Sequence, residues 1–156
     1  MNKPILDPCC GSRMFWFDKG NPDAIFGDIR NESHTLCDGR ALEIAPDIEM
    51  DFTDMPFPDE TFFLVVLDPP HLVNLGRNSW MAKKYGVLPQ NWQNVIRDGF
   101  NEGMRVLKKN GTLIFKWNET QIPVSEIIKT IGTQPLFGHK SGRQSKTIWM
   151  CFMKLN

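Results

Sequence analysis

Short apolar runs alternate along the chain with longer segments in which apolar residues recur at helical spacing. The apolar runs predict strands over residues 5–6, 24–26, 48–52, 62–67, 112–117, 136–138 and 147–153. The segments between them predict helices over residues 12–19, 39–45, 91–107 and 124–131. The run 62–67 is apolar throughout and stops at Asp-Pro-Pro, so it should be a buried central strand.

This alternation of strand and helix is typical of an α/β fold with a doubly wound, mostly parallel sheet. The last two strands are separated by too few residues for a crossover helix, so they should pair as an antiparallel hairpin. The sequence therefore predicts a single Rossmann-like domain over residues 1–156 whose sheet ends in a hairpin.

Composition narrows the class of protein. The 156 residues are 41% hydrophobic, enough for a core without disulfides, and they contain no secretory segment and no apolar run near 18 residues. The four cysteines form no C-x-x-C pair, so we expect reduced thiols in a cytoplasmic protein and no metal site.

Charge is divided unevenly between the two halves. Residues 1–70 hold 5 Lys and Arg against 14 Asp and Glu, and residues 71–156 hold 13 against 4. One half could suit a cationic ligand and the other an anionic partner, or the two halves could simply attract each other.

Four predicted strands end in an acidic residue. The segments are Asp7-Pro8-Cys9-Cys10-Gly11-Ser12, Asp28, Asp51-Phe52 and Asp68-Pro69-Pro70-His71. Parallel strands place these ends at one edge of the sheet, where ligands bind and like charges repel. Such an edge suits a positively charged ligand with a ribose. The G-x-G-x-x-G pattern of NAD and FAD enzymes is absent, and S-adenosylmethionine (SAM), which has a sulfonium and no phosphate, fits better.

These segments resemble the motifs of class I SAM-dependent methyltransferases. The first is similar to the family's D-P-x-x-G-S loop, and residues 51–57 are similar to its D-x-x-x-L-P-F segment. Residues 105–111 resemble its R-x-L-K-x-G-G segment, and Asp68-Pro69-Pro70-His71 resembles the D-P-P-Y motif of enzymes that methylate exocyclic amino groups. The resemblance covers nearly the whole chain, in the family's order, and extends to small phage and prophage enzymes.

The resemblance implies a cofactor site and a catalytic segment. The cofactor-binding residues it implies are Asp7, Pro8, Cys9, Gly11, Asp28, Asp51, Phe52 and Asp68. Asp28 would accept hydrogen bonds from the ribose, whereas Phe52 would either pack on the adenine or belong to the core. The catalytic residues it implies are Asp68, Pro69, Pro70 and His71. Asp68 and the Pro69 carbonyl would hold the two N–H groups of an amine so that its lone pair points at the methyl group.

The sequence departs from the family pattern at several positions. Arg13 replaces a glycine and could crowd the loop or reach over the ligand. No segment resembles a target-recognition domain, so specificity could come from a partner protein or be low. His71 replaces the tyrosine of D-P-P-Y, and it could stack on a base, take a proton or have no role. Trp117 or Asn118, at the end of strand 112–117, could touch a substrate.

Basic residues cluster in two segments of the second half. They are Lys83 and Lys84, and Lys140, Arg143 and Lys146 in the loop of the predicted hairpin. Both clusters could hold the phosphates of DNA or RNA, and the loop could equally serve solubility.

Three functions follow from these patterns. The leading hypothesis is SAM-dependent methylation of an exocyclic or amide nitrogen, with adenine N6 in DNA or RNA as the acceptor. The second keeps the cofactor and changes the acceptor to a protein side chain or a small molecule. The third is a non-catalytic module that binds SAM or nucleic acid.

Overall fold

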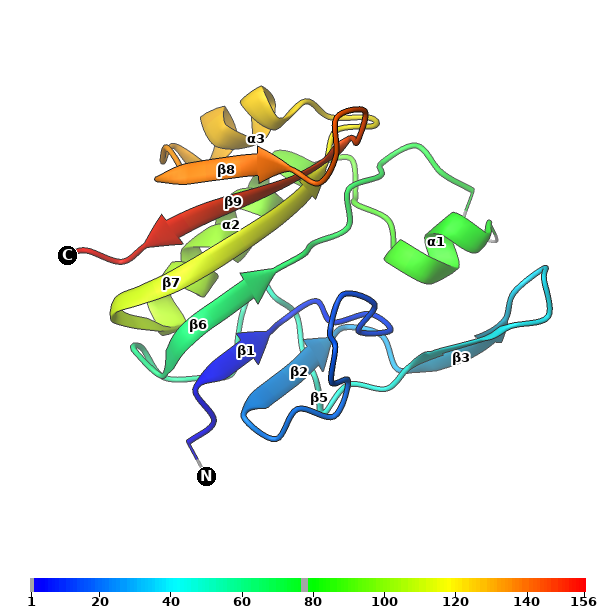
Figure 1. Ribbon diagram of the computed structural model, residues 1–156, viewed down its shortest axis with the longest axis horizontal. Coiled ribbons are helices and arrows are strands. Elements are labelled where there is room, and N and C mark those ends of the chain that lie inside the picture. Colours follow the sequence, from blue (N-terminus) through cyan, green and yellow to red (C-terminus); the bar gives the residue numbers. More distant parts are fainter. Residues whose placement is uncertain (1, 77–78) are drawn as a thin grey trace.

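The computed structural model describes residues 2–76 and 79–156. Seven strands form one sheet in the order β5-β2-β1-β6-β7-β9-β8, and β3 and β4 form a separate two-stranded sheet (Figure 1). The strands are β1 (Ile5–Asp7), β2 (Ala24–Asp28), β3 (Glu32–Thr35), β4 (Ala41–Ile44), β5 (Ile48–Glu49), β6 (Phe62–Leu67), β7 (Leu107–Asn118), β8 (Phe137–Lys140) and β9 (Thr147–Met153).

The pairing confirms the predicted sheet. The strands from β5 through β7 pair in parallel, and β9 runs antiparallel to both of its neighbours, β7 and β8. The order of connection reverses between β1 and β6, because the chain moves outward from β1 to β2 and β5 and then returns to β6. In open α/β sheets this reversal opens a crevice at the carboxyl ends of the strands, where ligands bind.

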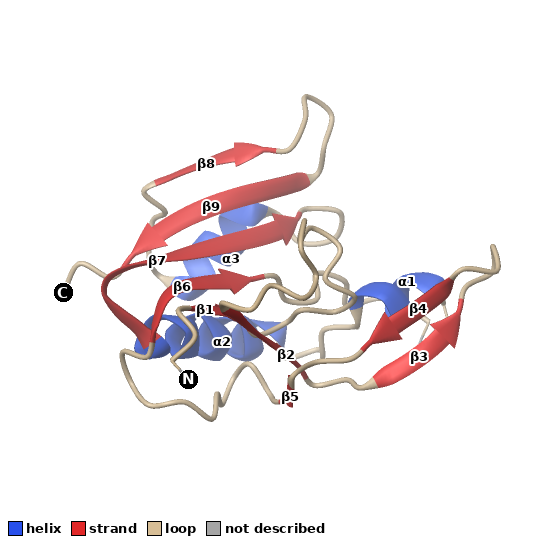
Figure 2. Ribbon diagram, turned by 60° about the horizontal axis from the view of Figure 1, so that its bottom comes forward, coloured by secondary structure: helices blue, strands red, loops and turns tan. Residues whose placement is uncertain are grey.

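The helices are α1 (Trp80–Tyr85), α2 (Trp92–Val106) and α3 (Val124–Ile131). Helices α2 and α3 lie on the same face of the sheet, and α1 lies beyond the carboxyl ends of the strands (Figures 1 and 2). Side chains of α2 and α3 share one core with the strands beneath them; these include Ile96, Phe100, Ile127, Val65 and Phe115. This core fixes β6 and β7, and with them the start of the Asp68 segment.

The helix predicted over residues 12–19 is wrong. These residues form turns that lie between β1 and β2, and Arg13 has a φ of 59°, which an α-helix does not allow. Trp16 anchors the segment, because its Nε1 donates to Asp7 Oδ2 at 2.8 Å and its ring packs edge-on against Phe26 at 4.8 Å. Tertiary contacts of the aromatic side chains have therefore overridden the local helical spacing.

The helix predicted over residues 39–45 is also wrong, since residues 41–44 form β4. Leu42 and Ile44 are buried whereas Ala41 and Glu43 are exposed, which is the two-residue period of a strand. Pairing with β3 completes a hairpin that projects from the sheet (Figure 2). Other boundaries differ less: β5 covers only two residues of the predicted 48–52 strand, and β7 begins at Leu107. Residues 80–85, for which no helix was predicted, form α1.

Arg105, in the last turn of α2, connects two of the segments on which the family resemblance rests. Its guanidinium donates to the carbonyl oxygens of Met55 and Phe57 and to the carboxylates of Asp59 and Glu102. The hydrogen bonds with Glu102 and Asp59, and the charges of these two residues, raise the pKa of Arg105 above its usual value. The guanidinium that joins the two segments therefore stays charged. The loop that follows the β5 end is thereby held against α2.

Candidate active site

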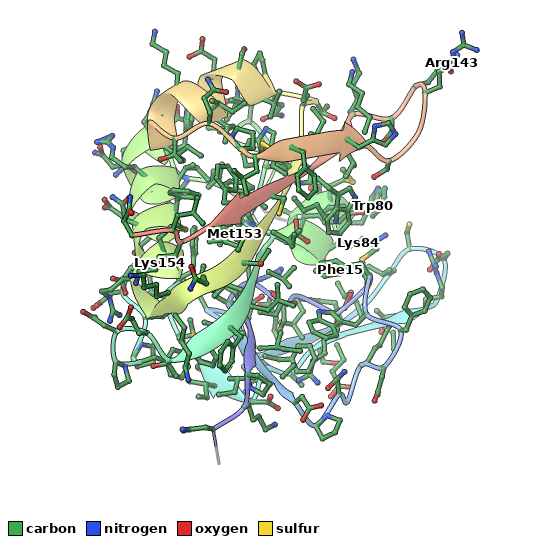
Figure 3. All side chains as sticks on the ribbon, turned by 60° about the vertical axis from the view of Figure 1, so that its left-hand side comes forward. Phe15, Trp80, Lys84, Arg143, Met153 and Lys154 are labelled. Atoms are coloured by element: carbon green, nitrogen blue, oxygen red, sulfur yellow. The ribbon has the colours of Figure 1, made fainter. Side chains whose placement is uncertain are left out.

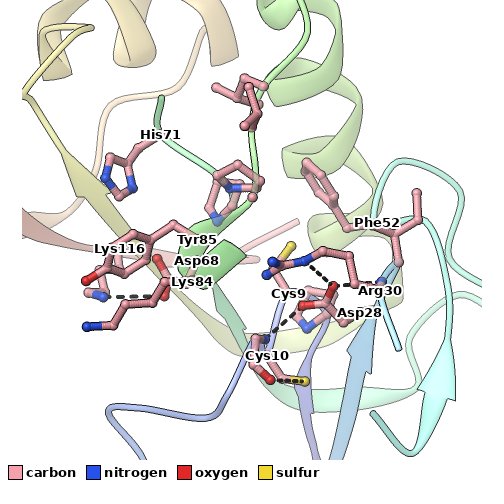
Figure 4. Close-up of a pocket in the computed structure, with 18 of the residues that line it drawn as sticks. Cys9, Cys10, Asp28, Arg30, Phe52, Asp68, His71, Lys84, Tyr85 and Lys116 are labelled. Carbon is pink, nitrogen blue, oxygen red and sulfur yellow. Dashed lines mark hydrogen bonds and ion pairs between the residues drawn. The ribbon is translucent and has the colours of Figure 1, made fainter. Parts of the chain in front are cut away.

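A cavity of about 470 Å³ opens at the carboxyl ends of β1, β2, β6 and β7. It is lined by most of the residues that the sequence predicts for the site: Pro8, Cys9, Gly11, Asp28, Asp51, Phe52, Asp68, Pro69, Pro70 and His71. Figure 4 shows two groups of side chains in it, with Cys9, Asp28, Arg30 and Phe52 on one side and Asp68, His71, Lys84, Tyr85 and Lys116 on the other. After the roles that the family resemblance implies for them, we call the first the cofactor end and the second the acceptor end.

Asp7 differs from the sequence prediction, because its side chain does not line the cavity. It is fully buried and accepts hydrogen bonds from Trp16 Nε1 and from the Cys9 backbone. Burial raises the pKa of Asp7 to about 7 although the Trp16 hydrogen bond opposes the shift. Asp7 is directed away from the cavity because it bonds to Trp16 and Cys9 of the 8–23 segment, and these bonds anchor that segment.

At the cofactor end, Asp28 organises the loop after β1. Its Oδ2 accepts from the Gly11 backbone N–H at 2.8 Å and its Oδ1 accepts from the Arg30 backbone N–H at 2.9 Å. Gly11 has a φ of +52°, a conformation that favours glycine and brings the loop close to the carboxylate. Arg30 also places its Nε 3.4 Å from Asp28 Oδ1 and donates from Nη1 to the Lys83 carbonyl, which joins the end of β2 to α1.

Phe52 belongs to the core and also faces the cavity, and its packing on an adenine stays a prediction. Its ring packs against the main core and also lines the cavity. Gly99 in α2 makes this placement possible, because a Cβ at Gly99 would collide with the Phe52 ring. Asp51 beside it is exposed and accepts from the Thr53 hydroxyl at 2.7 Å, so its carboxylate stays at the cavity wall.

At the acceptor end, Asp68 faces Lys116. Asp68 Oδ2 lies 3.4 Å from Lys116 Nζ, and each side chain is about 25% exposed. Burial raises the pKa of Asp68 to about 6, and the Lys116 charge opposes part of that rise. Asp68 is therefore mostly ionised at pH 7 and carries an accessible, incompletely solvated carboxylate.

His71 lies among aromatic rings beside this pair. Its ring centroid is 5.4 Å from that of Tyr85 and 6.3 Å from that of Trp117. Burial and the nearby Lys116 charge lower the pKa of His71 to about 4, so the imidazole is neutral at pH 7. A neutral ring in an aromatic setting suits stacking better than proton uptake.

The predicted phosphate-holding residues lie at different distances from the cavity. Lys84 lines the cavity, whereas Lys83 contributes its carbonyl to Arg30. Lys140, Arg143 and Lys146 do not line the cavity, and Figure 3 shows Arg143 at the far tip of the β8–β9 turn, well apart from Lys84. The two basic segments are therefore separate surfaces at the same edge of the sheet.

Neither a family model nor a curated protein matches the chain. Among solved structures, the T. thermophilus 16S rRNA N2 G1207 methyltransferase RsmC, in complex with AdoMet and guanosine, superposes with a TM-score of 0.52 at 14% identity. The match covers 97% of this chain and 35% of that one. This chain has the Rossmann-like methyltransferase fold.

Two further structures match less well. A predicted O-methyltransferase from Agrobacterium tumefaciens has a TM-score of 0.42 at 18% identity over 69% of this chain and 47% of its own. The [4+2]-cyclase SpnF has a TM-score of 0.49 at 15% identity over 90% of this chain and 55% of its own. The chain thus spans between about a third and about half of the length of the proteins it matches.

Several cavity residues were not predicted from sequence. Arg30, Tyr85 and Phe15 line the cavity, and so does Lys116, a charged residue that follows the apolar run Leu113–Phe115 in β7 and precedes Trp117. Trp117 itself is 1% exposed and donates to the Ile122 carbonyl, so it belongs to the core rather than to a substrate surface. Asn118 does line the cavity.

Arg13 does not line the cavity either. Its guanidinium donates to the carbonyl oxygens of Lys19 and Ala45 and lies 3.9 Å from the centre of the Phe26 ring. It therefore ties the 8–23 segment to neighbouring elements, and the loop at Gly11 stays open.

Two features are absent from residues 2–76 and 79–156. No three His, Cys, Asp or Glu side chains in these ranges are grouped so that they could hold a metal ion. No helix there combines the length and the apolar character needed to cross a bilayer.

Proposed function

We propose that this chain transfers a methyl group from SAM to an exocyclic or amide nitrogen, with adenine N6 in DNA or RNA as the acceptor. The observation that carries the proposal is the shared cavity: the Asp68-Pro69-Pro70 segment and the Asp28–Gly11 pair line the same space. A methyl donor bound at one end and an amine bound at the other would then meet inside it.

The cofactor end fits SAM in its chemistry. Asp28 still has lone pairs for ribose hydroxyls beyond those used by Gly11 and Arg30, since a carboxylate has about four acceptor sites. The Phe52 ring offers an apolar surface for an adenine, and the polypeptide at Gly11 can approach a ligand closely. Pro8, Cys9, Asp51 and Asp68 complete the proposed contacts.

At the acceptor end, the chain's own residues orient the amine. When bound, SAM supplies an electrophilic methyl group on a sulfonium. Asp68 and the Pro69 carbonyl accept hydrogen bonds from the two N–H groups of the acceptor, which favours a pyramidal nitrogen with its lone pair free. The two prolines fix φ on both sides of the Pro69 carbonyl. Once the nitrogen is methylated it must lose a proton, and Asp68, ionised above about pH 6, is placed to receive it.

Three observations support a nucleic acid as the carrier of that nitrogen. The neutral His71 ring beside Tyr85 offers a stacking surface for a flipped base. Lys83, Lys84, Lys140, Arg143 and Lys146 place cations at the same edge of the sheet. RsmC, which shares the fold, is named as an rRNA methyltransferase. Sequence specificity would then need a protein partner or be low.

The test is isothermal titration of the full chain with SAM, followed by transfer of a tritiated methyl group to DNA, RNA and proteins of a host lysate. We expect SAM binding and label in nucleic acid at an amino nitrogen. Label in protein alone would support the second function, and SAM binding without transfer to any acceptor would support a non-catalytic module. Titrations that show NADH binding and no SAM binding would contradict the proposal.

A cytoplasmic location and a phage or prophage origin remain predictions. All four cysteines, Cys9, Cys10, Cys37 and Cys151, are unpaired thiols, as a reducing compartment would keep them.

A further inference from the structure

Lys116 and Asp68 form a donor and an acceptor side by side at the acceptor end. Lys116 Nζ lies 3.4 Å from Asp68 Oδ2, and within the described parts of the chain this carboxylate is its only hydrogen-bond acceptor. An ammonium has three N–H groups, so two remain free, and Asp68 keeps unused lone pairs. Both side chains line the cavity.

The rings around this pair favour a flat ligand. The ring centres of Phe15 and Trp149 lie 5.2 and 5.6 Å from Lys116 Nζ. These cation–π contacts hold the Lys116 ammonium group at the edge of the cavity. His71 and Tyr85, whose ring centres are 5.4 Å apart, lie on the same side of the cavity as Lys116 (Figure 4). A planar group stacked on the His71 and Tyr85 rings would lie near both the donor and the acceptor.

We infer that Lys116 and Asp68 together read the edge of a base that carries an amino group next to an unprotonated ring nitrogen. This inference rests on the proposed function. Asp68 would accept from the amino N–H, and Lys116 would donate to the neighbouring ring nitrogen. Adenine presents this pattern at N6 and N1, and cytosine presents it at N4 and N3. Guanine places an N–H donor, N1–H, on the Watson–Crick side of its amino group and presents an unprotonated nitrogen, N3, only on the sugar side, so a site that reads the Watson–Crick edge would disfavour guanine.

The experiment compares single-stranded oligonucleotides that carry adenine, 1-deazaadenine, 7-deazaadenine or guanine at the methylated position. With the wild type, replacing N1 by carbon should lower kcat/KM by about 10- to 100-fold, the loss expected when a charged donor loses its acceptor. The 7-deaza change should have little effect, and guanine should be a poor acceptor.

The variant Lys116→Met should show the same loss on adenine and no further loss on 1-deazaadenine, because the contact is already absent. Comparing the two bases within each variant cancels any effect of the Lys116 charge on Asp68. Lys116→Arg keeps a donor and should keep the discrimination. Lys108→Met is the matched control, since Lys108 lies on the same strand, stacks on Phe63 and does not line the cavity.

An equal preference for adenine over 1-deazaadenine in the wild type and in Lys116→Met would overturn this inference alone. Guanine methylated as well as adenine would also overturn it. If the wild type binds SAM and methylates none of the oligonucleotides, both the proposed function and this inference are wrong.

Discussion

The cofactor end and the acceptor end of the cavity differ in how far their polar groups are already paired. At the cofactor end, Asp28 accepts hydrogen bonds from two backbone N–H groups and an arginine, and Arg30 is also bound to a carbonyl. At the acceptor end, the Asp68 carboxylate has one long contact with Lys116, and its pKa is raised to about 6 by burial. Most hydrogen-bonding groups at the cofactor end already have partners within the protein, whereas Asp68 and Lys116 at the acceptor end keep unused hydrogen-bonding sites.

This difference suggests that one end of the cavity is suited to binding a ligand and the other to reacting with one. A group with paired polar atoms is held rigidly and suits a ligand that is bound in the same way at every turnover. A partly desolvated carboxylate with free lone pairs is stabilised by a partner that arrives with the substrate, as groups at reactive sites commonly are. Substitutions at the two ends should therefore alter different measured quantities.

The largest effect is expected for Asp68→Ala. Loss of one preorganised acceptor should lower kcat by on the order of 100-fold or more and leave the Kd for SAM within a few-fold. Isothermal titration and a tritiated-methyl assay measure the two quantities separately. Asp98→Ala, an exposed acid on α2, is the control. Near-full turnover in Asp68→Ala on every acceptor of the wild type would show that Asp68 is only the end of a strand.

The next effect is expected for Asp28→Ala, which should act on binding. Losing a charge-assisted contact to the ribose should raise the Kd for SAM by roughly 5- to 150-fold, the equivalent of about 1–3 kcal/mol. Asp38→Ala is a close control. Like Asp28, Asp38 pairs with the arginine two residues later in the chain, here Arg40, but it lies on the exposed turn between β3 and β4. Equal SAM affinity in both variants would remove the ribose contact from the proposal.

A smaller effect is expected at His71. If the neutral ring stacks on the acceptor, His71→Phe should keep activity within about 3-fold and His71→Ala should lose roughly 10-fold. The pH profile provides a second measurement: activity should fall as pH drops through about 6, where Asp68 gains a proton, and His71, with a pKa of about 4, should add no change near neutrality. Loss of activity in both variants would instead indicate proton transfer by the imidazole.

The smallest effect is expected for the β8–β9 turn, which lies outside the cavity. Lys140→Ala combined with Arg143→Ala should reduce the log–log dependence of nucleic-acid affinity on salt by about 0.7–0.9 for each phosphate that these cations neutralise in the wild type. Turnover of a mononucleoside acceptor should not change. Lys108→Ala with Lys129→Ala removes the same charge elsewhere. A salt slope equal to that of the wild type would show that these residues of the turn do not contact phosphates, and would favour a role in solubility.

The strands of the seven-stranded sheet and the position of the cavity could be predicted because they depend on patterns local to the chain. The apolar run 62–67 became β6 with the predicted bounds, and each Asp at a strand end came to the same edge because parallel strands share their direction. The hairpin of β8 and β9 followed from the length of its connection alone.

The failures arose where contacts between distant residues decide the structure. Ala41-Leu42-Glu43 contains good helix formers, yet pairing with β3 made it a strand. Trp16 reached Asp7 and so turned a predicted ligand contact into an internal anchor. The partners of Arg30 and Lys116 depend on how α1 and β6 lie beside them, which spacing along the chain does not encode.

The irregular 8–23 segment, which stands where a helix was expected, has a consequence for the order of folding. Its internal hydrogen bonds are the short-range bonds of turns rather than a helical ladder, and other contacts join positions far apart along the chain, such as Arg13 with Ala45. Contacts between residues so far apart along the chain form only after β2 and β4 have taken their places in the structure. Gly11 and its neighbours should thus be among the last parts of the chain to become ordered and, in the native state, among the first to open to amide hydrogen exchange. A newly made chain would then acquire its packed sheet before it acquires the loop that the proposed cofactor would contact.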